Sequence, residues 1–177
     1  MFVTLNGYFE GPNGDIRWHR HGAEEQQYSV EGLKSESILL FGRKTYEMMA
    51  SYWPTPMAAQ NSPLVAEGMN KAEKIVFSRT LEKAEWINTR VVRDNIFEEI
   101  KAMKNSPGKD MTILGSGSIV TQFAEHRLID EFQIMIDPVA IGEGSTIFKN
   151  IKTKLDLKLV GSRTFKSGVV LLTYYPE

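Results

Sequence analysis

The chain has 177 residues, of which 42% are hydrophobic and 24% are charged, and its formal net charge at pH 7 is −1. These values predict one globular domain over residues 1–177, and they give no electrostatic reason to expect nucleic acid or a membrane surface as a partner. The lack of cysteine excludes disulfides, thiolate metal sites and cysteine nucleophiles, and we expect a cytoplasmic protein with neither a signal peptide nor a membrane-spanning segment.

A long glycine-rich loop, residues 6–18, is predicted directly after the first strand. Long loops inside compact domains often act as active-site lids, and Trp18 is placed where it can line a pocket. On the helix expected next, Glu24, Glu25 and Glu36 are candidate proton donors. A solvated helix position is the more common role for such carboxylates.

Three short segments, residues 38–41, 74–77 and 111–114, predict buried strands, and the first is a continuous apolar run, as expected for a strand covered on both faces. The first runs into Gly42 and a helix over residues 44–51. The second is followed by a helix that Asp94 can cap, and the third by a helix with Ile119 facing inward.

Farther along, apolar residues alternate over residues 132–136, 155–159 and 169–173, with a tight turn expected at Ser167-Gly168. Parallel βα units followed by alternating strands predict an α/β fold. We expect a mixed, mostly parallel central sheet with helices on both faces and an antiparallel C-terminal hairpin.

Ligands of such sheets collect at the carboxyl ends of the parallel strands. There, Gly115-Ser116-Gly117-Ser118 suits a pyrophosphate, because its glycines allow close backbone approach and the next helix offers free N–H groups. The alternative is a plain strand-to-helix turn with Ser116 or Ser118 as the N-cap. The third glycine of the dinucleotide fingerprint is absent, since Val120 stands there.

Two further loops carry the same chemistry. In Gly42-Arg43-Lys44-Thr45, two cations and a hydroxyl can meet phosphate oxygens, although a solvated first helical turn would look similar. In Ser78-Arg79-Thr80, an arginine after a strand can accommodate a 2′-phosphate, which favours NADP over NAD. The coincidence of three such loops favours the binding interpretation over ordinary surface residues.

The chain has three histidines. His19 and His21 are two residues apart in a predicted loop, and no third ligand stands out, so we interpret them as ordinary loop histidines and expect no metal site. His126 lies near a helix C-terminus, where a cation suits the dipole, and is interpreted as structural.

In order along the chain, these segments resemble the dihydrofolate-reductase-like superfamily, and most closely its branch with the reductase domain of the bifunctional riboflavin-biosynthesis deaminase-reductase. The resemblance runs from about residue 3 to about residue 150. It rests on the following motifs: Leu5-Asn6-Gly7-Tyr8, Gly11-Pro12-Asn13-Gly14-Asp15, Leu40-Phe41-Gly42-Arg43-Lys44-Thr45-Tyr46-Glu47, Phe77-Ser78-Arg79-Thr80-Leu81, Leu114-Gly115-Ser116-Gly117-Ser118, Ile129-Asp130-Glu131 and the run from Asp137 to Gly144.

The resemblance implies NADPH as cofactor, bound through Gly42, Arg43, Lys44 and Thr45, through Ser78, Arg79 and Thr80, and through Gly115, Ser116, Gly117, Ser118 and Ile119. It also implies that the loop from Asn6 to Asp15 closes over the nicotinamide, so Asn6, Asp15, Trp18 and Glu24 are the candidate catalytic residues. A small heterocyclic substrate and a homodimer are expected on the same basis.

Two other functions stay open. A dihydrofolate reductase would carry an acidic residue early in the helix after the lid, and Gln26 stands near that position. A nucleotide-binding module without catalysis would bind NADPH and never oxidise it.

Overall fold

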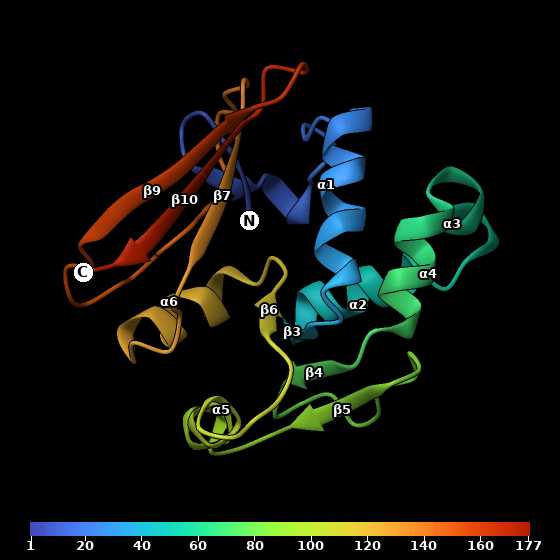
Figure 1. The fold of residues 1–177 in the computed structure, drawn as a ribbon, viewed down its shortest axis with the longest axis vertical. Coiled ribbons are helices and arrows are strands. Elements are labelled where there is room, and N and C mark those ends of the chain that lie inside the picture. Colours follow the sequence, from blue (N-terminus) through green and yellow to red (C-terminus); the bar gives the residue numbers. More distant parts are fainter. The chain divides into compact units, whose positions relative to one another are not determined.

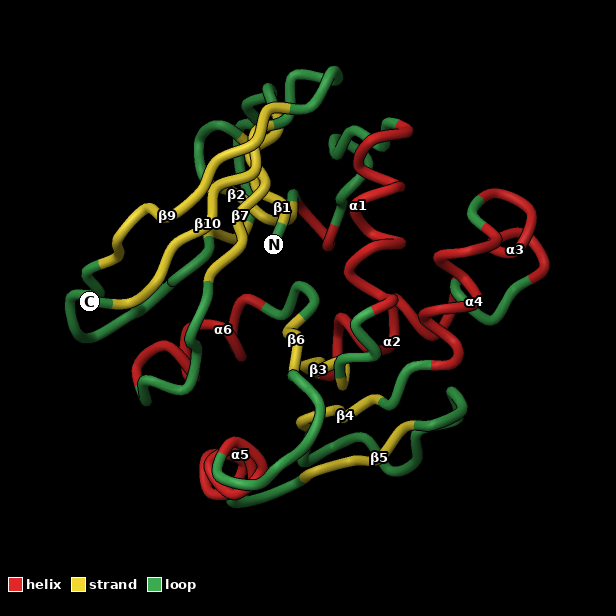
Figure 2. The backbone as a smooth tube through the Cα atoms, viewed as in Figure 1, coloured by secondary structure: helices red, strands yellow, loops and turns green.

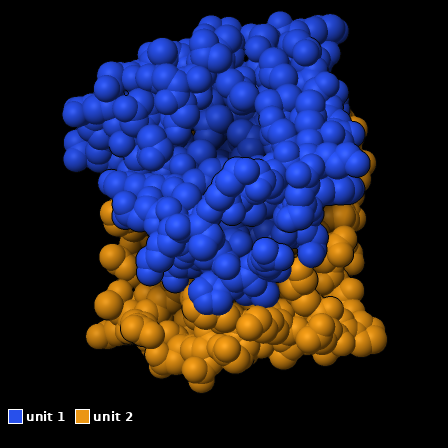
Figure 3. Space-filling view, turned by 90° about the vertical axis from the view of Figure 1, so that its left-hand side faces the viewer, with its two compact units in different colours: residues 1–25, 117–177 blue, residues 26–116 orange.

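The computed structural model describes residues 1–177, which divide into two compact units. The central unit comprises residues 26–116, and the discontinuous unit comprises residues 1–25 and 117–177; Figure 3 colours them orange and blue. No helix is both long enough and apolar enough to span a membrane.

The central unit contains a parallel four-stranded sheet in the order β5-β4-β3-β6. Its strands are β3 (Ile38–Gly42), β4 (Lys74–Phe77), β5 (Thr89–Val92) and β6 (Met111–Ile113). All four residues of β4 and the first four of β3 are buried, because helices cover both faces of the sheet. The register pairs Gly42 with Phe77, so β3 and β4 end side by side.

Helices lie on both faces of this sheet. They are α2 (Arg43–Tyr52), α3 (Pro56–Asn61), α4 (Pro63–Lys71) and α5 (Ile96–Lys104), with the later part of α1 (Ala23–Lys34). The connections from β3 to β4 and from β5 to β6 cross the sheet in opposite directions, so right-handed crossovers put α5 on the face opposite α2 and α4 (Figure 1). On the α2 and α4 face, Leu39, Phe41 and Val76 pack with Tyr46 and Met69.

The discontinuous unit holds a second four-stranded sheet, in the order β1-β7-β10-β9. Its strands are β1 (Phe2–Thr4), β7 (Phe132–Asp137), β9 (Leu157–Thr164) and β10 (Val170–Pro176). β1 pairs with β7 in parallel, and the other pairs are antiparallel. Figure 2 shows β9 and β10 as a yellow hairpin, closed by a turn in which Gly168 has φ +90°. Helix α6 (Gly117–Glu125) belongs to this unit and buries Phe123.

These elements confirm the α/β fold, the three parallel strands with helices on both faces and the C-terminal hairpin. Two local predictions were wrong. Asn95, in a left-handed conformation, is the residue at the start of α5, and Asp94 instead forms an ion pair with Arg79. Residues 6–18 are not one irregular loop, because they contain β2 (Tyr8–Glu10), which pairs with β8 (Ser145–Thr146), and a short 3-10 helix, Pro12–Gly14.

Candidate functional site

Three of the sequence motifs meet at the carboxyl edge of the parallel sheet in the central unit. Because β4, β3 and β6 are neighbours, the segments that follow them, beginning at Ser78, Arg43 and Leu114, leave the same edge. The structure therefore brings together the residues expected to contact phosphate groups, apart from those that begin α6.

A hydrogen bond joins two of these segments. The backbone N–H of Gly42 donates to Ser116 Oγ at 2.8 Å, so the turn after β6 is tied to the end of β3. Ser116 is buried and has φ +60°, a left-handed conformation that is unusual for a residue with a side chain. Backbone strain of this kind is concentrated at ligand-binding sites.

Gly115 shapes the same turn. Its φ is +63°, and a Cβ at this position would lie 3.1 Å from Thr45 Cγ2. A side chain would therefore be strained by the backbone and crowded by the half-buried Thr45. The close approach of residues 115 and 45 explains why residue 115 is a glycine.

The start of α2 offers positive charge. No side chain caps this end at Gly42, which leaves backbone N–H groups available, and Lys44 is exposed beside them. Arg43 Nη1 lies 3.1 Å from Glu47 Oε1 in an exposed i, i+4 pair, which is a weak interaction. These groups fit a phosphate-bearing ligand, because both the helix dipole and the cations attract an anion.

The segment after β4 is held by its own serine. Ser78 Oγ accepts hydrogen bonds from the backbone N–H groups of Thr80 at 3.2 Å and Leu81 at 2.9 Å. Arg79 Nε lies 3.3 Å from Asp94 Oδ1, and both side chains are exposed. The guanidinium is thus accessible to a ligand. Asp94, which we expected to cap the next helix, competes with such a ligand for Arg79.

The remaining residues of the third motif begin α6, in the discontinuous unit. A Cβ on Gly117 would lie 2.5 Å from the ring of Phe9 in β2, so a glycine is required for this packing. Ser118 is exposed and Ile119 is buried in the core, so only the backbone of Ile119 is suited to contact a ligand.

Among the predicted catalytic residues, Asn6 and Asp15 both hold the chain in place. Asn6 Nδ2 donates to the Ile141 carbonyl at 2.8 Å, and its Oδ1 accepts from Thr4 Oγ1 at 2.8 Å. Asp15 accepts hydrogen bonds from the side chain and backbone of Arg17, which lower the pKa of the carboxyl to about 2. At neutral pH this carboxyl therefore holds no proton to give.

Trp18 and Glu24 are also engaged. Trp18 Nε1 donates to the Asp15 carbonyl at 3.1 Å. Glu24 Oε2 accepts from the backbone N–H of Lys166 at 2.9 Å, and this hydrogen bond lowers the pKa of Glu24. Glu24 therefore fastens the start of α1 to the β9–β10 turn.

A buried pair that we did not predict lies at the carboxyl end of β7. His19 Nδ1 and Asp137 Oδ2 are 2.7 Å apart, and the two side chains are 3% and 0% exposed. The backbone N–H of Arg20 donates to the other carboxylate oxygen at 2.8 Å. Our interpretation of His19 as an ordinary loop histidine missed this partner, 118 positions away, although Asp137 at the end of an alternating strand was a polar signal.

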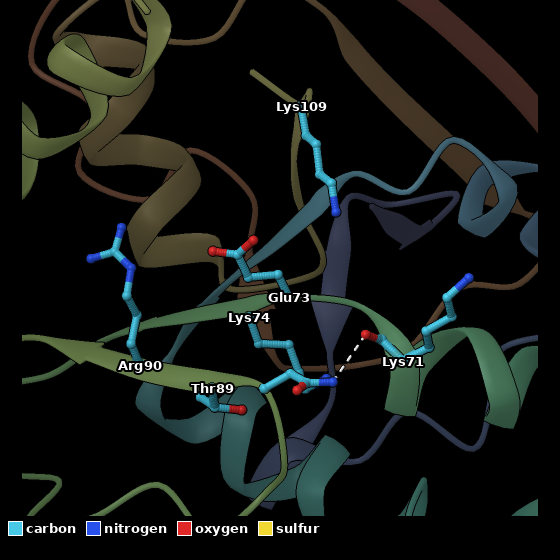
Figure 4. A pocket seen from close by; sticks show the side chains of 7 residues that line it. Lys71, Glu73, Lys74, Thr89, Arg90 and Lys109 are labelled. Carbon is cyan, nitrogen blue, oxygen red and sulfur yellow. Dashed lines mark hydrogen bonds between the residues drawn. The ribbon is translucent and has the colours of Figure 1, made fainter. Parts of the chain in front are cut away.

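A pocket of about 530 Å³ lies at the opposite, amino-terminal edge of the parallel sheet (Figure 4). Its lining comprises Lys71, Glu73, Lys74, Asn88, Thr89, Arg90 and Lys109. Lys74 is 0% exposed, and its Nζ donates to the carbonyls of Met69, Asn70 and Ala72 at 2.9, 3.2 and 2.5 Å. Its ammonium group therefore serves the C-terminal end of α4, where carbonyl groups lack helical partners.

Comparison with known proteins gives a consistent family. The model of the family described as the RibD C-terminal domain matches residues 1–171. YyaP of Bacillus subtilis strain 168 is 34% identical over 176 residues, which cover 99% of this chain and 92% of YyaP. YwjB of the same strain is 25% identical over 96% of this chain and 91% of YwjB.

Three solved structures share the fold. A putative riboflavin biosynthesis protein from Shewanella sp. PV-4 has a TM-score of 0.77 at 19% identity, covering 100% of this chain and 96% of its own. A pyrimidine reductase-like protein from Corynebacterium diphtheriae has a TM-score of 0.67 at 14% identity, and the match covers 99% of this chain and 89% of that protein. Dihydrofolate reductase from Enterococcus faecalis, complexed with NADP(H), has a TM-score of 0.64 at 17% identity, and the match covers 99% of this chain and 93% of that protein.

Proposed function

This chain belongs to the RibD C-terminal domain family, and on that premise we propose that it is an NADPH-dependent reductase of a small heterocycle. The substrate that we propose is 5-amino-6-(5-phosphoribosylamino)uracil, or a heterocycle close to it. When bound, NADPH supplies the hydride, and the protein supplies binding and orientation.

The observation that carries the proposal is the shared carboxyl edge of β3, β4 and β6. There the Gly42–Ser116 hydrogen bond fixes a turn in which Gly115 admits no side chain. The uncapped start of α2 and the exposed Lys44 are suited to the pyrophosphate, and Arg79 is suited to the 2′-phosphate of NADPH.

Dihydrofolate is a poorer candidate substrate. Gln26 stands near the position where the acid of a folate reductase is expected, and its Nε2 donates to Ser62 Oγ at 3.0 Å. An amide cannot provide the carboxylate that grips a pterin. We therefore expect no dihydrofolate-dependent oxidation of NADPH.

The test is a titration of the purified protein with NADPH and with NADH, followed by nucleotide fluorescence and by thermal unfolding. We expect saturable binding with a preference for NADPH, and then oxidation of NADPH when the aminouracil is added. Failure to bind either nucleotide would remove the proposal. Binding without oxidation by either the aminouracil or dihydrofolate would favour a nucleotide-binding module instead.

A further inference from the structure

We propose that His19, held by Asp137, is the catalytic residue that supplies the proton consumed in the reduction. The inference rests on the reductase function proposed above. In the proposed step, a carbon–heteroatom double bond of the substrate receives a hydride at carbon and the Nε2 proton of His19 at the heteroatom. NADPH is thereby oxidised to NADP⁺, and the imidazole regains a proton from water.

The first support is the atom that is left without a partner. His19 is only 8% exposed, and its Nε2 is buried and makes no hydrogen bond. Leaving a buried polar atom unpaired costs free energy, so native structures rarely contain one without a functional reason. A polar group of a bound substrate would satisfy this atom.

The second support is the geometry of the pair. Asp137 is completely buried, and one of its carboxylate oxygens contacts His19 Nδ1 while the other accepts from the Arg20 backbone. A carboxylate at Nδ1 fixes the tautomer and the orientation of the ring. Nε2 is then the imidazole atom at which a proton can be exchanged with a ligand.

The third support is the place of the pair in the fold. Asp137 ends β7 opposite Thr4, which ends the parallel strand β1, and ligands of parallel strands gather at such ends. His19 packs against the rings of Phe2 at 3.7 Å and Trp18 at 6.1 Å between centroids. It directly follows the segment expected to act as the lid.

The titratable and charged groups around His19 are each less suited than His19 to donate the proton. His21 lies 4.3 Å away between ring centroids, and its pKa is lowered, first by partial desolvation and then by His19. The Arg20 guanidinium donates to the Ser167 carbonyl at 2.9 Å, and Glu25 accepts a hydrogen bond from Ser167 Oγ. Asp15 is deprotonated at neutral pH, since its pKa is about 2.

The deciding measurement is the hydrogen-bonding state of the His19 ring, read by NMR of protein labelled with ¹⁵N at histidine. His19→Gln assigns the signals, and Asp137→Asn tests the pair. We expect the His19 ring to carry a proton at Nδ1 that is hydrogen-bonded to Asp137, so Asp137→Asn should shift the ¹⁵N signals of this ring. A ring whose ¹⁵N signals are the same in the wild type and in Asp137→Asn would overturn the proposal.

A second arm uses turnover of the aminouracil substrate with NADPH. His19→Gln should lower kcat roughly a hundredfold, which is typical for loss of a general acid, with an unchanged Kd for NADPH. His21→Gln is the matched control and should keep kcat within twofold. Wild-type kcat in His19→Gln would refute the role of His19. A wild-type protein that binds no NADPH would instead refute the reductase function, while the NMR spectra would still decide whether Asp137 holds the His19 ring.

Discussion

The two edges of the parallel sheet in the central unit both carry cations, but these cations meet opposite ends of helices. At the amino-terminal edge, the ammonium group of Lys74 donates to three carbonyls at the C-terminal end of α4. At the carboxyl edge, Arg43 and Lys44 lie at the start of α2, where the helix dipole repels them. The protein itself satisfies the first cation, whereas the second pair gains most from an external anion. Positive charge alone therefore does not mark a binding site.

The largest effect is expected when the amino-terminal edge loses its cation. Lys74→Met would leave the carbonyls at the end of α4 without donors and remove the ammonium group 4.5 Å from the Trp86 ring centroid. We expect a loss of about 2 kcal/mol in the free energy of unfolding at pH 7, measured by urea denaturation. NADPH affinity should not change, because the pocket lies away from the proposed site. A loss of NADPH affinity in Lys74→Met would contradict the distinction between the two edges.

The same variant gives a pH test. Burial lowers the pKa of Lys74 to about 8 from its ordinary value of 10.5. Between these values the unfolded chain holds more protons than the folded protein, so this residue makes stability rise with pH. From pH 8 to pH 10, the unfolding free energy of the wild type should therefore rise relative to that of Lys74→Met. A difference that stays constant over this range would show that the folded protein leaves Lys74 with its ordinary affinity for protons.

At the carboxyl edge, the turn after β6 should tolerate no side chain. Gly115→Ala places a Cβ at φ +63° and 3.1 Å from Thr45 Cγ2, which should cost about 1–2 kcal/mol of stability. We also expect NADPH to bind roughly tenfold more weakly, since displacing the turn disturbs the backbone proposed to contact the pyrophosphate. Gly108→Ala is the matched control, because a Cβ there would meet nothing closer than 3.9 Å. Equal effects of the two substitutions would contradict a special role for Gly115.

Arg79 should determine the choice between the two nucleotides. Arg79→Ala is expected to weaken NADPH binding roughly tenfold and NADH binding much less, because a charge-assisted contact to the 2′-phosphate is lost. Arg90→Ala, at the amino-terminal edge, should leave both affinities unchanged. Equal losses for NADPH and NADH in Arg79→Ala would refute the assignment.

The smallest effect concerns the competitor of Arg79. Asp94→Asn removes the carboxylate that lies 3.3 Å from the guanidinium, so NADPH should bind about two- to threefold more tightly at low salt. Glu99→Gln is the control, because Glu99 forms the equivalent exposed pair with Arg90 at 2.7 Å. Weaker NADPH binding in Asp94→Asn would mean that this acid helps to position Arg79 rather than compete for it.

Much of the parallel sheet could be predicted from the sequence. Strand β3 is an apolar run that ends at Gly42, and β4 is apolar after Lys74 and is followed by Ser78, a pattern that depends only on neighbouring residues. Strand β5 was missed because Thr89–Val92 is short and mostly half-exposed. Helices α3 and α4 were also missed, although Pro56 and Pro63 stand at their first positions, where proline is favoured.

Part of the candidate site could likewise be predicted from the sequence, and part could not. The segments after β3, β4 and β6 follow from the rule for parallel strands, so their shared edge could be predicted. The pairing of His19 with Asp137 could not, because it depends on β1 lying beside β7, whose register no local pattern specifies. The ion pair of Arg79 with Asp94 was hidden for a similar reason, since Asp94 was assigned to the start of α5.

Amine-reactive labels should distinguish Lys74 from the other lysines of the chain. It is the only lysine of the chain that is not exposed, and its amine lies beneath the end of α4. Amine-reactive reagents should therefore modify the other lysines of the folded protein and reach Lys74 only when this part of the chain opens. The rate of Lys74 modification, read by mass spectrometry, would thus report the opening of the β4–α4 region without any introduced probe.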